Sequence, residues 1–242
     1  MTIRTSKDQA LATHEIKSIY DRAYGERGLM GTHFDREYSS ATKSTLISYC
    51  EAAPNPRLLD VGTGDGDLWE FVDSSKERYG IDISEVGVKT AVSRFAGVHG
   101  SVGVAEHLPY PDRFFGAVVA ADTLEHTIDL DASLVEIRRV LAPGGLFAFS
   151  VPAPDSLRKW GYNNFVRQRP QIGKAVRLAG LVLKRTLMFG RADFQPIDRD
   201  MSLEEWAATI EQAGFELGAR EKWPTAPYLP IVYLMFARAK VD

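Results

Sequence analysis

Short apolar runs alternate along the chain with stretches of helical spacing, which predicts a domain of alternating strands and helices. Nearly continuous apolar runs occupy 58–61, 114–122 and 146–151, as expected for parallel strands that are buried on both faces. The stretch 134–141 instead places its apolar residues at helical intervals. This alternation predicts an α/β fold, a doubly wound and mostly parallel sheet with helices on both faces.

The first fifty residues predict two helices with a break between them. The helical pattern begins near residue 8 and is interrupted by glycines from Gly25 onward, and a second helix is expected from about 34 to 50. Aromatic residues gather at the break, and Tyr20 and Tyr24 are candidates for lining a pocket. Ordinary helix packing is the alternative for both tyrosines.

The last forty residues predict a helix followed by two strands. Ser202 has the position and type of a helix N-cap, and the apolar stretches 215–217 and 231–237 are the expected strands. The chain has no internal repeat and no linker-like composition. We therefore expect a single domain over residues 1–242.

Three glycines at alternate positions follow the first buried strand, and a helix is expected directly after them, at about 68–72. Gly62, Gly64 and Gly66 would permit backbone angles forbidden to other residues and let a ligand approach the main chain. The spacing differs from the dinucleotide fingerprint G-x-G-x-x-G, because position 67 is Asp. A phosphate loop is excluded too, since no Gly-Lys-Ser/Thr follows.

With Asp60 before the glycines, this stretch resembles the first motif of class I S-adenosylmethionine (SAM) methyltransferases, (L/V)-(L/V)-D-x-G-x-G-x-G. The resemblance implies a seven-stranded sheet in the order 3-2-1-4-5-7-6, with the last strand antiparallel. It implies SAM as the cofactor, with Asp60, Gly62, Gly64 and Gly66 at its methionine tail and Asp60 as an anionic wall. A plain glycine-rich strand–helix turn is the alternative.

A second acidic residue ends the next predicted strand. Asp82 lies about 20 residues past the glycines, where a carboxylate that binds both ribose hydroxyls is expected. By resemblance, Ile83 would lie against the adenine ring. The alternative for Asp82 is that it only precedes a helix capped by Ser84.

The segment 104–109 resembles the signature D-A-E-x-L-P of the same family. The family's first acid often contacts the adenine amino group, and Val104 replaces it here. The resemblance leaves the backbone N–H of Ala105 and the carboxylate of Glu106 as candidates for adenine recognition. A further departure is Gly116, where the family usually has Asp.

The fourth predicted strand ends in Asp122-Thr123-Leu124-Glu125-His126, which resembles the x-x-L-E-H sequence at the family's pocket rim. The stretch L-x-E-I-x-R-V-L-x-P-G-G at 134–145 is also characteristic of the family. We assign Asp122 to cofactor binding. His126 is the candidate catalytic base, because an imidazole with a pKa near 6.5 suits proton removal at neutral pH. A structural role for His126 in the rim is the alternative.

The stretch 158–191 is strongly basic. No acidic residue lies between Asp155 and Asp193. Nine basic residues occupy it: Arg158, Lys159, Arg167, Arg169, Lys174, Arg177, Lys184, Arg185 and Arg191. Three interpretations stay open: recognition of an anionic or lipid-like acceptor, contact with an acidic membrane surface, and the solvated face of a lid helix.

Composition narrows the class of protein. The net charge of −3 gives no general case for nucleic-acid binding. The single cysteine, Cys50, excludes a disulfide framework, and no signal-peptide or membrane-spanning stretch is present, so a cytoplasmic location is expected. The five histidines have no metal-ligand spacing. The oligomeric state cannot be derived from these patterns.

The resemblance implies a SAM-dependent methyltransferase that acts on an oxygen, nitrogen or carbon atom of a small molecule. Within the single domain, four parts are expected: an N-terminal helical lid at 1–52, a cofactor-binding core at 57–152, a basic helical insertion at 156–193, and a C-terminal helix with strands at 202–242. Three alternatives remain: a non-catalytic SAM-binding protein, a nicotinamide-dependent oxidoreductase, and an enzyme that uses the cofactor for other chemistry.

Overall fold

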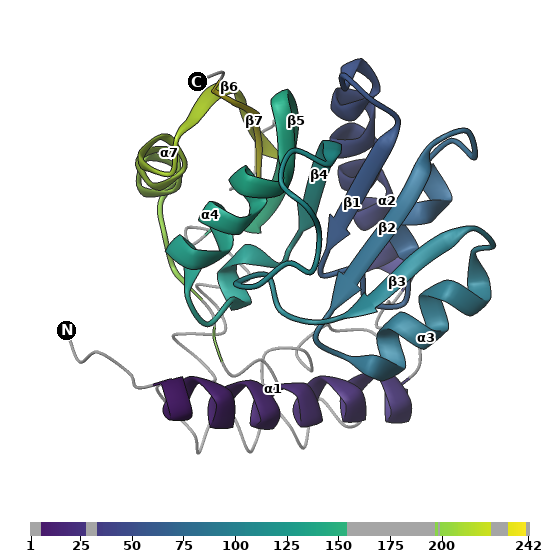
Figure 1. Ribbon diagram of the computed structural model, residues 1–242. Coiled ribbons are helices and arrows are strands. Elements are labelled where there is room, and N and C mark those ends of the chain that lie inside the picture. The colour runs from purple at the N-terminus through teal and green to yellow at the C-terminus, as the bar shows by residue number, and fades with distance from the viewer. Residues whose placement is uncertain (1–5, 28–32, 154–196, 198, 224–231, 241–242) are drawn as a thin grey trace.

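The computed structural model describes residues 6–27, 33–153, 197, 199–223 and 232–240, which form one seven-stranded sheet (Figure 1). The strand order is β3-β2-β1-β4-β5-β7-β6. Strand β7 is antiparallel to both of its neighbours, and the other pairs are parallel. The strands are β1 Arg57–Val61, β2 Glu77–Asp82, β3 Val98–Val102, β4 Phe115–Ala121, β5 Leu141–Pro152, β6 Phe215–Trp223 and β7 Val232–Ala239. The predicted fold class and strand order are confirmed.

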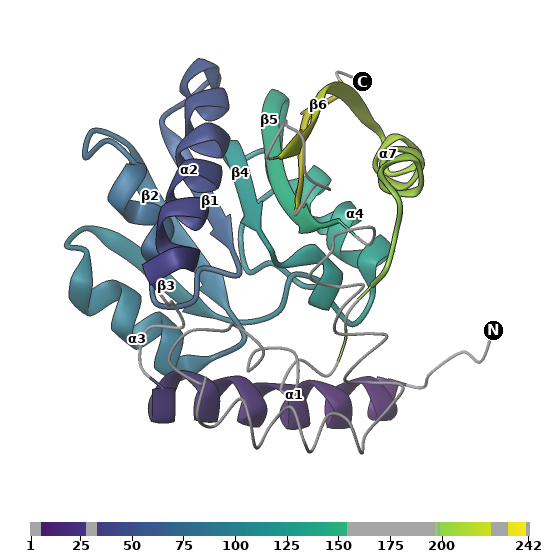
Figure 2. The same cartoon turned by 180° about the vertical axis from the view of Figure 1, so that it is seen from behind.

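Helices cover both faces of the sheet, and one helix crosses its edge (Figures 1 and 2). Helices α2 and α3 lie on one face, and α4 and α7 lie on the other, whereas α1 runs across the carboxyl ends of β1 and β2. The α-helices are α1 Ser6–Arg27, α2 His33–Tyr49, α3 Glu85–Arg94, α4 Leu130–Val140 and α7 Leu203–Gln212. Single 3₁₀ turns are η1 Cys50–Ala52, η2 Asp67–Phe71 and η3 Leu124–His126.

Each face of the sheet has its own apolar core, because side chains of a strand point alternately to the two faces. Leu46 of α2 packs with Val119 of β4 in one cluster. Leu134 of α4 and Trp206 of α7 pack with Val118 in the other cluster. All five of these side chains are fully buried. The central strand β4 is therefore covered on both faces, as its continuous apolar run predicted.

Three local predictions are wrong. Helix α1 continues through Gly25 to Arg27, and a side chain at Gly25 would meet no neighbouring atom. The segment after the glycines forms only the 3₁₀ turn η2, because Gly66 before it has a left-handed backbone with φ 90°. Strand β5 begins at Leu141, which pairs with Phe115, so helix α4 passes directly into the strand.

Packing explains why position 116 is a glycine. A Cβ atom at this position would lie 2.3 Å from the backbone oxygen of Asn55, in the turn before β1. Any side chain would therefore collide with that turn. The turn thus lies against β4 where the family usually has an aspartate.

The basic stretch 158–191 lies outside the described residues, so its three interpretations remain open. Among the residues that the structure describes, no helix is both long enough and apolar enough to span a bilayer.

Candidate active site

The predicted cofactor residues lie at or after the carboxyl ends of β1, β2, β3 and β4, which is where open α/β sheets bind ligands. Helix α1 passes over this edge (Figure 1). The site is therefore bounded by the strand ends and by a helix from the first part of the chain.

The glycine loop after β1 has the conformation that its sequence predicted. Gly62, Gly64 and Gly66 all have left-handed backbones, with φ of 79°, 50° and 90°. Space also excludes side chains: a Cβ at Gly62 would lie 2.2 Å from Thr123 Oγ1, and one at Gly64 would lie 2.4 Å from Tyr24 Oη. The main chain of this loop is thus held close to the segment after β4 and to α1.

Asp82 connects the glycine loop to helix α3. Its Oδ2 accepts the backbone N–H of Gly64 at 2.9 Å, and its Oδ1 accepts that of Ser84 at 2.8 Å. Ser84 is also the N-cap of α3 and accepts the Gly87 N–H at 3.1 Å. Burial raises the pKa of Asp82 to about 6, against the opposing effect of these N–H groups. Each oxygen keeps a second lone pair that could accept a ribose hydroxyl.

Asp60 adds a second buried carboxyl group beside the loop. Its side chain is 2% exposed. Burial raises the pKa of Asp60 to about 7, although a hydrogen bond from Thr63 acts in the other direction. Two buried carboxyl groups beside one loop favour a ligand that carries positive charge, such as a sulfonium or an ammonium group.

Helix α1 is tied to the N-terminus of α3 by Asp21, a residue that the sequence did not indicate. Asp21 Oδ1 accepts the Ser84 hydroxyl at 2.7 Å and the Val86 N–H at 3.2 Å. This contact brings Tyr24 over the glycine loop, and burial together with the charge of Asp82 raises the pKa of Tyr24 well above its ordinary value. Tyr20, the other aromatic candidate, is half-buried on the same helix.

The residues that are predicted to contact adenine fall into two groups. Ile83 is half-buried directly after β2, and Ala105 is buried in the loop after β3. The Glu106 carboxylate instead accepts the backbone N–H groups of Ile128 at 2.6 Å and Asp129 at 3.0 Å. Glu106 therefore holds the start of α4, and its role in cofactor binding stays a prediction.

Both ring nitrogens of His126 have partners in the structure. Nδ1 lies 2.6 Å from the backbone oxygen of Ile197, and Nε2 lies 3.3 Å from Oε1 of the fully buried Glu125. Since a carbonyl can only accept, Nδ1 must carry a proton. This arrangement gives His126 a structural role at the rim that competes with the predicted role of general base.

Arg199 strengthens the same rim, and sequence reasoning missed it. Its guanidinium donates to two backbone oxygens directly after η3, those of Thr127 and of Ile128, the latter at 3.1 Å. Its own N–H donates to the Glu125 oxygen at 3.1 Å. Contacts over more than 70 residues of sequence leave no local pattern, so no signal in the sequence pointed to Arg199.

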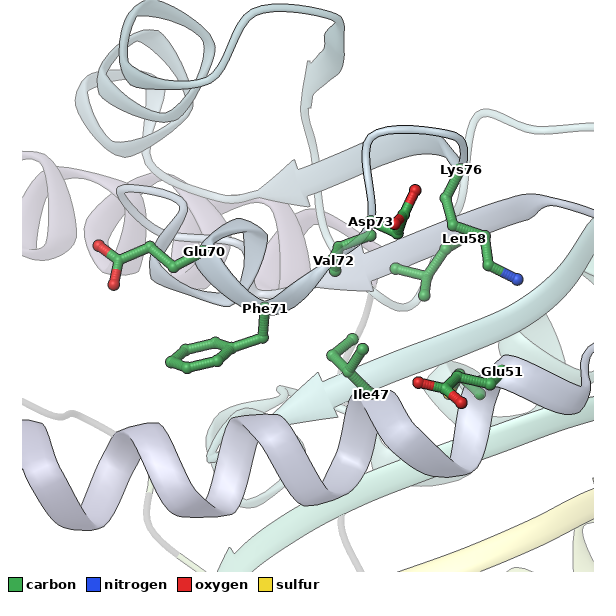
Figure 3. Close-up of a pocket in the computed structure, with 9 residues that line it drawn as sticks. Ile47, Glu51, Leu58, Glu70, Phe71, Val72, Asp73 and Lys76 are labelled. Carbon is green, nitrogen blue, oxygen red and sulfur yellow. The ribbon is translucent and has the colours of Figure 1, made fainter.

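A hollow lies on the far side of the sheet from the carboxyl ends of the strands. It has a volume of about 380 Å³ and is lined by residues such as Ile47 of α2, Leu58 at the start of β1, and Lys76 before β2 (Figure 3). Cys50 also lines it, and burial raises the pKa of this thiol to about 12. The hollow lies at the amino ends of the strands, away from the predicted cofactor residues.

Comparison with known proteins agrees with this geometry. Residues 59–149 match the family described as "Methyltransferase domain". A ubiquinone/menaquinone biosynthesis C-methyltransferase from Geotalea daltonii is 34% identical over 134 residues, which cover 50% of this chain and 57% of the relative. The chain thus spans little more than half the length of that curated relative.

Solved structures show the same fold. A 1,6-didemethyltoxoflavin N1-methyltransferase from Burkholderia thailandensis, with bound S-adenosylhomocysteine, superimposes with a TM-score of 0.67 at 15% identity, covering 100% of this chain and 93% of that chain. The [4+2]-cyclase SpnF gives a TM-score of 0.62 at 18% identity, covering 100% and 98%. Residues 59–149 therefore match a methyltransferase domain, and the seven-stranded sheet has the fold of the class I SAM-dependent methyltransferases.

Proposed function

We propose that this protein transfers the methyl group of SAM to a small-molecule acceptor. The observation that carries the proposal is the glycine loop of β1 lying between two buried carboxyl groups, Asp60 and Asp82. SAM carries a sulfonium and an α-ammonium group, whose positive charges suit a site beside these two carboxyl groups. In this proposal the loop glycines receive the methionine tail, Asp82 the ribose, and Ile83 with the Ala105 N–H the adenine.

The protein's contribution to methyl transfer is mainly alignment. The sulfonium is already an activated leaving group, so the acceptor atom needs to be held in line with the S–CH₃ bond. Helix α1 covers the strand ends (Figure 2) and would exclude water from this position. Exclusion of water strengthens the attraction between the carboxyl groups and the cationic cofactor.

Names of related proteins support a small acceptor. The Geotalea relative is named for methylation at carbon in quinone biosynthesis, and the Burkholderia enzyme is named for methylation at nitrogen of a toxoflavin precursor. We therefore place the acceptor among small molecules, without a role for nucleic acid. The basic stretch 158–191 supports an anionic acceptor or lipid headgroups as a further part of the proposal, and the single cysteine supports a cytoplasmic location.

A second function deserves a test because of one comparison. SpnF is named a cyclase and has this fold, and one fold can support different chemistry. Incubation of the protein with methyl-labelled SAM and a panel of phenols, amines and quinols distinguishes methyl transfer from this second function. Transfer of the label supports our proposal, whereas conversion of an acceptor without label would favour the second function. Calorimetric titration with SAM and S-adenosylhomocysteine measures cofactor binding independently of any acceptor.

A further inference from the structure

Asp122 lies at the carboxyl end of β4, immediately after the strand. In the order β3-β2-β1-β4, the ribose-binding Asp82 ends β2, the glycine loop follows β1, and Asp122 comes next. Thr123, the following residue, lies against Gly62. A cofactor that extends from β2 to the loop of β1 therefore directs its methionine side towards Asp122.

The backbone of Asp122 is strained. Its φ is 50°, a left-handed conformation that is unfavourable for a residue with a side chain. Strain of this kind persists only where surrounding contacts impose it, and it is concentrated at functional sites. The left-handed conformation of Asp122 therefore calls for a structural cause and suggests a functional role.

Ser150 of β5 supplies the cause. It is fully buried on the strand that pairs with β4. The Asp122 N–H donates to the Ser150 backbone oxygen at 3.0 Å and to its Oγ at 3.1 Å. In return, the Ser150 hydroxyl donates to Asp122 Oδ1 at 2.9 Å. The backbone N–H and one carboxylate oxygen of Asp122 are therefore both held by one residue, Ser150.

The second carboxylate oxygen of Asp122 has no hydrogen bond within the described part of the chain, and the residue is exposed. Its neighbours differ in this respect. The Glu106 carboxylate is bonded to two backbone N–H groups, and His126 has a partner at each ring nitrogen. Asp122 is thus a rim residue that offers a proton acceptor to a bound molecule.

We propose that Asp122 is a catalytic residue that takes the proton from a hydroxyl or amine acceptor, and that Ser150 is the positioning residue that aims its carboxylate. The inference rests on the proposed function. A lone pair of the acceptor forms the new bond to the methyl carbon, the C–S bond breaks with its electrons passing to sulfur, and the acceptor's proton passes to Asp122 Oδ2. The products are the methylated acceptor, a neutral thioether and a protonated Asp122, which later loses its proton to water.

The test uses binding, so it needs no identified acceptor. Sinefungin, a SAM analogue with an amino-bearing carbon in place of the methylated sulfur, places an ammonium group near the position of the transferred methyl. Calorimetry gives its affinity relative to that of S-adenosylhomocysteine. In the wild type, a charge-assisted hydrogen bond to Asp122 should favour sinefungin by about tenfold or more.

In Asp122→Asn, the affinities for sinefungin and S-adenosylhomocysteine should differ by no more than about threefold, because the amide keeps the hydrogen bond with Ser150 and removes the charge. Ser150→Ala should reduce the preference as well, and Ser150→Thr, which keeps the hydroxyl, should restore it. Asp82→Asn is the matched control: it should weaken both ligands equally and leave their ratio unchanged. Circular dichroism checks that each variant is folded. If Asp122→Asn does not fold, the comparison of Ser150→Ala with the wild type provides the test.

Three outcomes would overturn the inference. The preference could survive in Asp122→Asn, or both ligands could weaken equally there, which would make Asp122 a plain cofactor ligand. Equal binding of the two ligands to the wild type would remove the inference and leave the cofactor assignment standing. If neither ligand bound the wild type, the proposed function itself would fail.

Discussion

Replacement of Asp60 by Asn should make the cofactor-free protein more stable at alkaline pH. The pKa of Asp60 rises from 3.8 to about 7 in the folded protein because the group is buried. Between these two values the folded state keeps a proton that the unfolded state has lost, so stability falls as pH rises. Each tenfold change in proton affinity is about 1.4 kcal/mol, which gives a cost of about 4 kcal/mol above pH 7.

Asp60→Asn removes that cost and keeps an oxygen that can accept the Thr63 hydrogen bond. The variant should therefore match the wild type near pH 4 and exceed its free energy of unfolding by about 2–4 kcal/mol at pH 8. The buried Asp82 retains its own pH dependence in both proteins. Urea titrations followed by circular dichroism at several pH values measure the difference.

Asp73→Asn is the control for this experiment. Asp73 is exposed, and the backbone N–H of Ser75 lowers its pKa, so removing its charge should bring no gain at pH 8. The same logic predicts that SAM affinity in the wild type rises with pH through about 7, as Asp60 loses its proton. Equal stability of Asp60→Asn and wild type at pH 8 would refute the reasoning.

Three further predictions concern the loop, the rim and the basic stretch. Gly62→Ala should lower the free energy of unfolding by about 1–3 kcal/mol or more in urea titration, because of its positive φ and its contact with Thr123; unchanged stability would contradict the described loop. His126→Gln should keep kcat within about tenfold, whereas a general base predicts a loss of about 10²-fold and an altered pH–rate profile. Neutralising four basic residues of the stretch 158–191 should raise the acceptor's KM and leave SAM affinity unchanged. Added salt should have the same effect, because the screening length is only about 10 Å at 0.1 M. If KM stays constant in both experiments, the stretch is a solvated face. These four are Lys174, Arg177, Lys184 and Arg185.

Features set by local sequence were predictable. The alternate glycines required a strand–loop turn, and the structure gives all three left-handed backbones. Ser202 was predicted as an N-cap, and it forms a full capping box with Glu205. The strand order followed from the resemblance, and the register of the central strands agrees with their apolar runs.

Features set by contacts between distant segments were not predictable. The bonds between Ser150 and Asp122 depend on the register of β4 against β5. The contact between His126 and Ile197 joins positions 71 residues apart. The partners of Glu106 lie in a loop that follows the next strand. A single sequence contains no spacing rule for such pairs, so residue roles at the rim were harder to predict than the cofactor loop.

Calorimetric titration of SAM, S-adenosylhomocysteine and NAD into the wild type and Asp82→Ala tests the central claim most directly. We predict that the wild type binds the first two ligands and not NAD. Asp82→Ala should lose roughly tenfold or more in affinity for both, because a hydrogen bond to a charged group contributes about 1.5–3 kcal/mol. Binding of NAD to the wild type, or unchanged SAM affinity in a folded Asp82→Ala variant, would contradict the account.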